Sequence, residues 1–228
     1  MHPSIPLNPI FDASRAPDPR SVHPIDRDPE TLPPLRSLWA ALSRRCGYDI
    51  RPARTPKQYG LTNSLVRRMY AWRGYRTEIH RQPLDDPNRV TLAAWQYEEV
   101  VATLTLRRDS PTGLLADAHY GDVLDRLRGP DRVVCEVSRL AIDPDFSSRD
   151  LLNNLFSAAL EYGREHFLAS DAVMEVNPRH VRYYQRCLGF QRIGDVRQCQ
   201  RVDAPAVLMH QEIDGIVIPD DVPPPAER

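Results

Sequence analysis

Three polar residues capable of chemistry interrupt a stretch that otherwise has the composition of a buried strand. Glu136, Ser138 and Arg139 stand among strand-forming apolar residues. These apolar residues are Val133, Val134, Val137, Leu140 and Ile142. Polar side chains in such a setting cost free energy unless something pairs with them. The pattern therefore indicates a ligand site, because packing alone does not require these residues.

A turn and a long amphipathic helix follow this strand. Asp143, Pro144 and Asp145 end the extended run, and either Ser147 or Ser148 is placed to cap the helix. The apolar positions that recur at helical spacing are Leu151, Leu152, Leu155, Phe156, Ala159 and Leu160. The first N–H groups of a helix are free and its N-terminal end is positive. This end therefore predicts a site for a phosphate or a carbonyl oxygen.

Composition narrows the class of protein. The chain has 228 residues, 41% hydrophobic and 27% charged, which is typical of a globular protein with one main domain. A net charge of −1 argues against a nucleic-acid partner. The cysteines lack C-x-x-C spacing and no HExxH motif occurs, so we expect neither a metal site nor a disulfide framework. No run approaches the about 20 apolar residues that span a bilayer. We therefore expect no transmembrane segment and a cytoplasmic location.

Both ends of the sequence differ in composition from its middle. Residues 1–34 contain nine prolines, which predict a flexible, extended arm. Residues 214–228, with four prolines and several charges, are predicted to form a flexible C-terminal tail. For both ends, a role in covering substrate or binding a partner stays open beside a purely solvated one. The folded domain is expected to span residues 35–213.

The order of elements in this domain predicts an α/β (α+β) fold. Helices are expected at 35–42, 59–72, 120–127, from Ser148 onward, and at 178–188, the last ended by Gly189. Strands are expected at 48–52, 90–95, 100–106, 132–142, 171–176, 190–197 and 204–213. The second and third strands form a hairpin, and residues 76–88 form a loop. The result is a mixed, mostly antiparallel sheet flanked by helices, with one central strand–helix–strand crossover.

Several segments resemble the GNAT-type N-acyltransferase superfamily. They are a YDIRPA-like opening followed by a helix, EVSRL on the central strand, VNPRH at the next strand end, YYQRCLGF after it, and a late APAVLM strand. Within the superfamily they are similar to the N-acyl amino acid synthases, whose relatives, the acyl-homoserine-lactone synthases, share the E-x-x-R pattern. The resemblance covers Tyr48 to Ile213. It implies a GNAT-like fold and an acyltransferase.

One departure bears on the acyl donor. Members that use acetyl-CoA carry glycines in the loop that wraps the pyrophosphate, whereas here the turn at residues 146–150 is FSSRD. Without glycine the backbone approaches a pyrophosphate less closely. The resemblance then favours the acyl-phosphopantetheine of an acyl carrier protein as donor substrate, with acyl-CoA as the alternative and no permanently bound cofactor. Ser147, Ser148, Arg149, Asn177 and His180 are the expected donor-binding residues. The basic helix around Arg179, Arg182 and Arg186 either meets the acidic carrier or is a solvated face.

The implied reaction is aminolysis of a thioester by the α-amine of an amino acid. This amine must lose a proton, and Glu136 is the candidate base, with a pKa raised by burial and lowered again if Arg139 pairs with it. A structural ion pair between the two is the alternative. Strict pleating puts Glu136 and Ser138 on one face and Arg139 on the other. A bulge or twist would be needed for Arg139 to bind the substrate carboxylate beside them.

The departing thiolate needs a proton donor, which in the superfamily is often a tyrosine on the last helix. Tyr184 matches that position, although a core role is equally compatible with the sequence. Ser138 is either a hydrogen-bond donor to substrate or a satisfied strand hydroxyl. The function expected is transfer of a long-chain acyl group from acyl carrier protein to an amino acid. The alternatives are a synthase of acyl lactones or of another amide, and a non-catalytic acyl-carrier-binding module.

Overall fold

The computed structural model describes residues 47–76, 85–216 and 218, and within these ranges eight strands form one sheet. Seven of them follow the order β1-β2-β3-β4-β5-β8-β6, and β7 also pairs with β8. The strands are β1 Asp49–Pro52, β2 Arg89–Gln96, β3 Glu99–Arg108, β4 Val134–Ile142, β5 Asp171–Val176, β6 Gln191–Arg192, β7 Arg197–Cys199 and β8 Ala204–Glu212. Among the strand pairs of the described residues, β4 and β5 are parallel and the others are antiparallel. The predicted mixed, mostly antiparallel sheet with one central crossover is confirmed.

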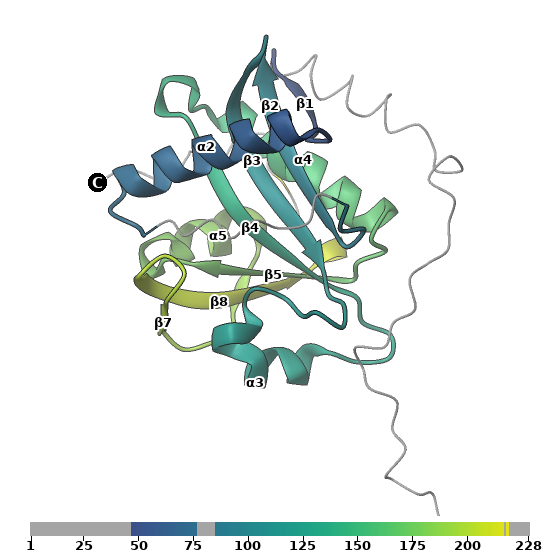
Figure 1. Ribbon diagram of the computed structural model, residues 1–228. Helices are drawn as coiled ribbons and strands as arrows, with labels where there is room; N and C mark the ends of the chain where they lie inside the picture. Colours follow the sequence, from purple (N-terminus) through teal and green to yellow (C-terminus); the bar gives the residue numbers. More distant parts are fainter. Residues whose placement is uncertain (1–46, 77–84, 217, 219–228) are drawn as a thin grey trace, which may run out of the picture.

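Helices cover both faces of this sheet (Figure 1). They are α2 Pro56–Trp72, α3 Asp117–Leu127, α4 Arg149–Glu165 and α5 Val181–Leu188, with short 3-10 helices η2 Pro144–Phe146, η3 Pro178–His180 and η4 Ile213–Gly215. In the view of Figure 1, α2 and α3 lie in front of the sheet, while α4 and α5 lie behind it. The crossover helix α4 connects the parallel strands β4 and β5. The front face therefore carries one helix near each end, with the middle strands between them.

The back face holds the largest apolar cluster. Its buried members come from α4, from α5 and from one side of each central strand, and include Leu151, Leu155, Phe156, Leu188 and Met209. A second cluster packs under α3, around Tyr120 and Val173, and a third packs under α2, around Leu65 and Ala93. The two front clusters are separate from each other. This separation leaves a polar strip of the sheet between α2 and α3.

Two local differences from the predicted elements have clear causes. Helix α2 begins at Pro56, three residues before the predicted start, because Thr55 and Gln58 form a capping box. The strand predicted at 190–197 is broken into β6 and β7, since the N–H groups of Ile193 and Gly194 both donate to the carbonyl of Leu208. Such a doubled pairing is a local irregularity that ends regular strand geometry.

The predicted ends of the domain are described only in part. The arm at 1–34, the helix at 35–42, most of the loop at 76–88 and most of the tail lie outside the described residues. At the C-terminus, η4 follows β8 and Ile216 is buried in the main core cluster. The packed chain thus extends past the predicted boundary at residue 213. None of the described helices is both long and apolar enough to cross a membrane.

Leu155 offers a test of the main core. Its side chain is fully buried on α4, so replacement by alanine removes apolar contacts and leaves a cavity. We expect Leu155→Ala to lower the free energy of unfolding by about 2–5 kcal/mol, measured by urea unfolding. Leu168→Ala is the control, because Leu168 is 43% exposed and its truncation should cost far less. Equal losses for the two variants would contradict this packing.

Candidate active site

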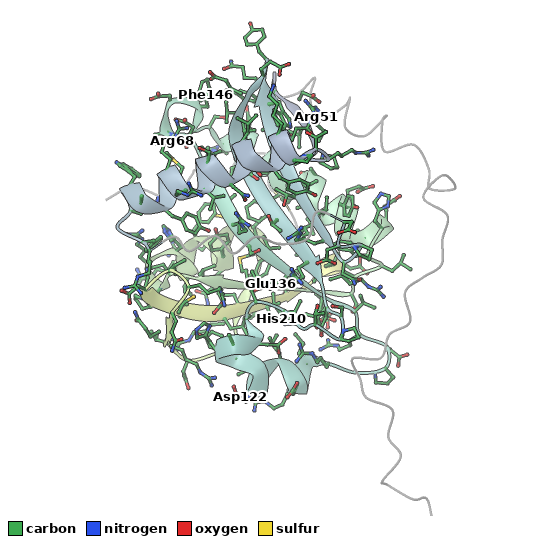
Figure 2. All side chains as sticks on the ribbon, in the orientation of Figure 1. Arg51, Arg68, Asp122, Glu136, Phe146 and His210 are labelled. Atoms are coloured by element: carbon green, nitrogen blue, oxygen red, sulfur yellow. The ribbon has the colours of Figure 1, made fainter. Side chains whose placement is uncertain are left out.

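The polar strip between α2 and α3 is built by neighbouring strands whose paired residues face the same way. Glu136 is paired with Arg107 of β3 on one side and with Val173 of β5 on the other. Ser138 is paired with Thr105, whose hydroxyl contacts that of Thr91 at 3.0 Å. Figure 2 shows Glu136 between α2 and α3. The strip thus carries a carboxylate, cations and hydroxyls on one face.

A bulge in β4 decides where Arg139 lies. The register between β3 and β4 shifts, so that Thr105 faces Ser138 but Thr103 faces Ala141. Two residues of β4, Arg139 and Leu140, therefore stand opposite the single Leu104, and Arg139 has φ +55°. Positive φ is uncommon for residues other than glycine and often marks a functional site. The bulge breaks the strict alternation that would put Arg139 on the back of the sheet.

Arg139 consequently belongs to the front face, as does Glu136. Its guanidinium donates to Asn63 Oδ1 of α2 at 2.5 Å. Burial lowers the pKa of Arg139, and the nearby Tyr70 hydroxyl raises it in part. No ion pair joins Arg139 to Glu136 in the described residues. The structural ion pair considered as an alternative is therefore not what holds either side chain.

Glu136 is held by backbone N–H groups. Its Oε2 accepts from Leu115 N at 2.6 Å and its Oε1 from Ala116 N at 3.1 Å. The residue is 1% exposed. Burial raises the pKa of Glu136 to about 7, although the two N–H groups and the charges of Arg201 and Arg107 act in the opposite direction. A carboxyl group with this pKa exchanges protons near neutral pH, as a general base requires.

Tyr184 lies on the other side of the sheet, on α5. Its ring makes edge-on contacts with Phe156 and Tyr183, and burial raises its pKa well above the usual range. The hydroxyl thus stays protonated at neutral pH and is able to donate. No hydrogen bond of this hydroxyl is found among the described residues. The structure brings Tyr184 close to the C-terminal end of α2, since Tyr70 and Arg73 influence its pKa, but not into contact with Glu136.

The donor-binding residues predicted from the sequence gather at the C-terminal ends of the parallel strands. Ser148 caps α4, its Oγ accepting from Leu151 N at 3.1 Å, while Ser147 follows η2. Asn177 caps η3, accepting from Arg179 N at 3.2 Å. Burial, with the charges of Arg179 and Arg73, lowers the pKa of His180 to about 4, so this ring is neutral.

Arg149 links the start of α4 to helix α5 through its charge. It follows Ser148 directly at the start of α4, and its charge lowers the pKa of Tyr183 on α5, against the effect of burial. In Figure 2, Phe146 of the turn before α4 lies far from Glu136, toward the other end of β4. The predicted residues therefore form two groups, one at each end of the exposed half of β4.

The strands β4 and β5 separate between these two groups. They pair only from Val134–Asp171 to Glu136–Val173, whereas β4 continues to Ile142 and β5 to Val176. Beyond Glu136, no strand in the described residues pairs with β4 on its β5 side. The backbone groups along that edge are consequently free to bind an extended chain.

Residues at the end of β5 and in the β7–β8 turn complete the front face, and the sequence pattern did not single them out. Arg201 donates to the carbonyl of Leu115 at 2.6 Å and forms an ion pair with Glu175. Glu175 in turn lies 3.2 Å from Nδ1 of His119. These residues are far apart in the sequence and belong to no motif. The one sequence signal for Glu175 is that a charged residue stands near the C-terminal end of a predicted strand.

His119, Glu175 and Cys199 present ligand atoms within 4.8 Å of one another, a spacing that a metal ion could use. The sequence predicted no metal site. In the structure, His119 Nε2 accepts from Gln200 N at 3.3 Å, which places the ring proton on Nδ1, facing Glu175. A metal ion bound to Nδ1 would require the ring proton on Nε2, where it would face the N–H of Gln200. This tautomer disfavours a metal ion at Nδ1, and His119 Nδ1 and Glu175 Oε1 are both buried without a hydrogen-bond partner among the described residues.

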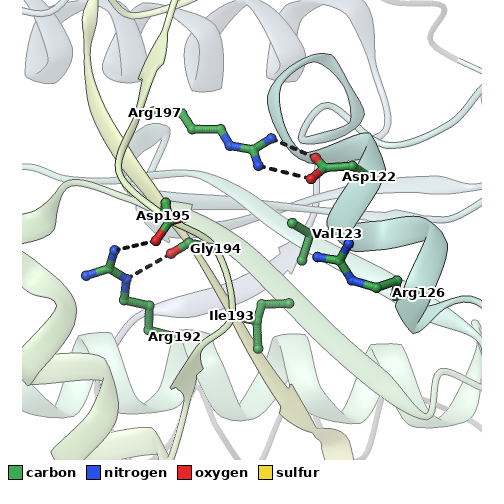
Figure 3. Close-up of a pocket in the computed structure, with 8 residues that line it drawn as sticks. All are labelled: Asp122, Val123, Arg126, Arg192, Ile193, Gly194, Asp195 and Arg197. Atoms are coloured by element: carbon green, nitrogen blue, oxygen red, sulfur yellow. Dashed lines mark hydrogen bonds and ion pairs between the residues drawn. The ribbon is translucent and has the colours of Figure 1, made fainter.

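A separate polar hollow of about 310 Å³ lies between α3 and the β6–β7 connection (Figure 3). Arg197 forms a two-bond ion pair with Asp122, at 2.7 and 3.1 Å, and Arg192 lies 3.4 Å from Asp195. Glu136 is not among its lining residues. This hollow is distinct from the strip between α2 and α3.

Known structures with a similar fold include several solved enzymes. The structure of FeeM, an N-acyl amino acid synthase from uncultured soil microbes, superposes with a TM-score of 0.69, at 24% identity, over 73% of this chain and 92% of that one. The acyl-homoserine-lactone synthase LasI gives a TM-score of 0.53 at 13% identity, over 73% of this chain and 89% of that one. The structure of Escherichia coli ElaA gives a TM-score of 0.53 at 13% identity, over 72% of this chain and 99% of that one. These likenesses show the fold.

The family follows from the sequence comparison. Residues 62–212 match the family model described as N-acyl amino acid synthase FeeM. Since the match covers more than half of the chain, the chain belongs to this family, and it is an N-acyltransferase. The comparison with curated proteins finds no match. The resemblance inferred from the E-x-x-R strand and the segments after it is thus confirmed.

The raised pKa of Glu136 predicts a pH-dependent contribution to stability. The pKa is about 7 in the folded protein against an ordinary value of 4.5, so the folded state binds the proton more tightly. The proton on Glu136 contributes its full stabilisation of the folded state below about pH 4.5. This stabilisation falls as the pH rises to about 7 and is absent above it. The total change is about 3 kcal/mol.

The measurement is urea unfolding between pH 4.5 and 8 for the natural protein and for Glu136→Gln. We expect the difference in unfolding free energy between the two to decline over this range and then to level off. Glu98→Gln is the control, because Glu98 is exposed at the tip of the β2–β3 hairpin. A difference that stays constant with pH would show that Glu136 ionises normally.

Proposed function

We propose that the protein transfers a long-chain fatty acyl group from the phosphopantetheine thioester of an acyl carrier protein to the α-amine of an amino acid. The observation that carries the proposal is the opening between β4 and β5. Ile142 lies six positions after Glu136, a distance of about 20 Å along a strand. An extended phosphopantetheine arm, with its two amides, suits an unpaired strand edge of this length. Its phosphate end would meet the N-terminus of α4, and its thioester would meet the residues around Glu136.

The start of α4 supports a carrier protein over coenzyme A. The turn from Phe146 to Asp150 has no glycine, and the Ser148 side chain already occupies the N–H of Leu151. Fewer N–H groups are thus left for a pyrophosphate, whereas a single phosphate needs fewer. Arg182 and Arg186 on α5 are exposed beside this end and could meet an acidic carrier surface.

The reaction is direct aminolysis. The amine nitrogen attacks the thioester carbonyl carbon and its proton passes to the Glu136 carboxylate, directly or through water. The C–S bond then breaks, and the pantetheine thiolate takes a proton from Tyr184. The products are an amide and a free thiol, and proton return from Glu136 to Tyr184 through solvent resets the site. Arg139 and Ser138, on the same face as Glu136, bind the carboxylate of the acceptor amino acid.

The test of this function is product analysis by mass spectrometry. Purified protein is incubated with long-chain acyl carrier protein or with acyl-CoA, each with a pool of amino acids. We expect N-acyl amino acids from the carrier-bound donor and a loss of about 10²–10⁴-fold in kcat for Glu136→Gln, as for removal of a general base. Glu98→Gln is the charge-matched control. Amides formed only from acyl-CoA would refute the carrier donor, and an acyl lactone as product would favour the alternative synthase.

Arg139 provides a test of the acceptor site. We expect Arg139→Lys to raise KM for the amino acid about 10- to 100-fold, because lysine cannot form two parallel hydrogen bonds to a carboxylate. The matched comparison uses the corresponding amino acid amide, which lacks the carboxylate. The variant and the natural protein should use this amide about equally. An equal loss with both acceptors would mean that Arg139 does not bind the carboxylate.

A further inference from the structure

Arg128 is a buried charged side chain with three carboxylate partners. It follows α3, and its side chain is only 3% exposed. The guanidinium donates to Asp109 at 2.6 and 3.2 Å and to Asp117 at 2.9 and 2.8 Å. It also donates to Asp125 at 2.8 Å. Burial alone would lower the pKa of Arg128, but these carboxylates raise it, so the group is permanently charged.

The two main partners of Arg128 stand at the two ends of one turn, residues 109–117. Asp109 donates its N–H to the carbonyl of Val134 at 2.8 Å, which attaches the turn to β4. At the other end, Asp117 accepts from Leu114 N at 2.7 Å. Inside the turn, Gly113 has φ +74°, and an added Cβ would lie 2.7 Å from the Asp117 carboxylate. The turn is therefore closed by one guanidinium and has little room to adjust.

This turn presents the two N–H groups that hold Glu136. Leu115 and Ala116 follow Leu114 directly, and each donates to one oxygen of the carboxylate. Arg128 itself does not contact Glu136; it acts on the residues between Asp109 and Asp117. Any movement of Asp117 would shift both donors, because they lie within two residues of it.

We propose that Arg128 is a positioning residue, which fixes the turn at 109–117 so that Leu115 and Ala116 orient the Glu136 carboxylate toward the acceptor amine. The catalytic consequence rests on the function proposed above. The structural part, which concerns the state of Glu136, does not depend on turnover and can be measured without substrate.

The groups around Glu136 determine in which direction its pKa changes when the turn at 109–117 is loosened. Two cations face it, Arg107 from β3 and Arg201 from the β7–β8 turn, and two thiols lie near, Cys135 on β4 and Cys199 on β7. The cations and the two N–H groups lower its pKa, and burial raises it. Loosening the turn removes the N–H contribution and leaves the others. We therefore expect the pKa of Glu136 to rise above about 7 in a variant with a loosened turn.

The experiment compares Arg128→Met and Arg128→Lys with the control Arg126→Met. Arg126 stands two residues earlier, on the exposed side of α3, so its replacement makes the same charge change away from the turn. Arg128→Lys keeps the charge but not the paired geometry, so it decides the question if Arg128→Met fails to fold. The Glu136 carboxyl is titrated by ¹³C NMR on glutamate-labelled protein, with Glu136→Gln identifying its signal. Amide exchange at Leu115 and Ala116 is measured alongside.

We expect both Arg128 variants to raise the Glu136 titration midpoint by about one pH unit and to speed exchange at the two amides at least tenfold, while Arg126→Met changes neither. The midpoint of kcat/KM against pH should shift by the same amount. A folded Arg128 variant with an unchanged midpoint would overturn the proposal and leave Arg128 a purely stabilising residue. A shifted midpoint without any amide product would uphold the positioning role and refute the proposed function instead.

Discussion

A carboxylate buried in the middle of a sheet is the constraint on which the rest of this structure depends. Glu136 is almost without solvent contact and sits among apolar strand residues, so its oxygens need donors from the protein. The turn before α3 supplies two backbone N–H groups. That turn is itself fixed by a buried arginine between two aspartates. The placement of α3 over one end of the front face is therefore tied to the ionisable group beneath it.

The separation of β4 from β5 is the second organising feature. Strands that pair along their whole length present no free backbone, whereas here only three residue pairs connect the parallel strands. Beyond them, no described residue pairs with this edge of β4 as far as its end at Ile142. The same strand thus carries the candidate base, the bulge with Arg139, and an edge suited to an extended thioester arm. In the proposed reaction, this one strand would position both substrates.

Much of the fold was predictable because it rests on local patterns. Helix α4 and the strands around it follow from apolar spacing and a serine cap, and the hairpin β2–β3 follows from two β-rich runs close together. The start of α2 was missed although Thr55 and Gln58 carry a capping-box signal. The break between β6 and β7 could not be predicted, since it arises where Gly194 packs against Tyr120 from a distant helix.

The family could be inferred from the sequence because E-x-x-R, the strand around it and the closing tyrosine-rich helix are contiguous segments, and the same segments contain the residues proposed for the site. Tertiary structure alone decided how these residues are used. The bulge at Arg139, which is set by register against β3, brought the arginine to the front face. The partners of Glu136 come from residues about twenty positions away, and Arg201 of the β7–β8 turn meets Glu175 of β5. Hydrogen bonds and ion pairs of this kind join atoms that only the folded chain brings together, so no local pattern records them.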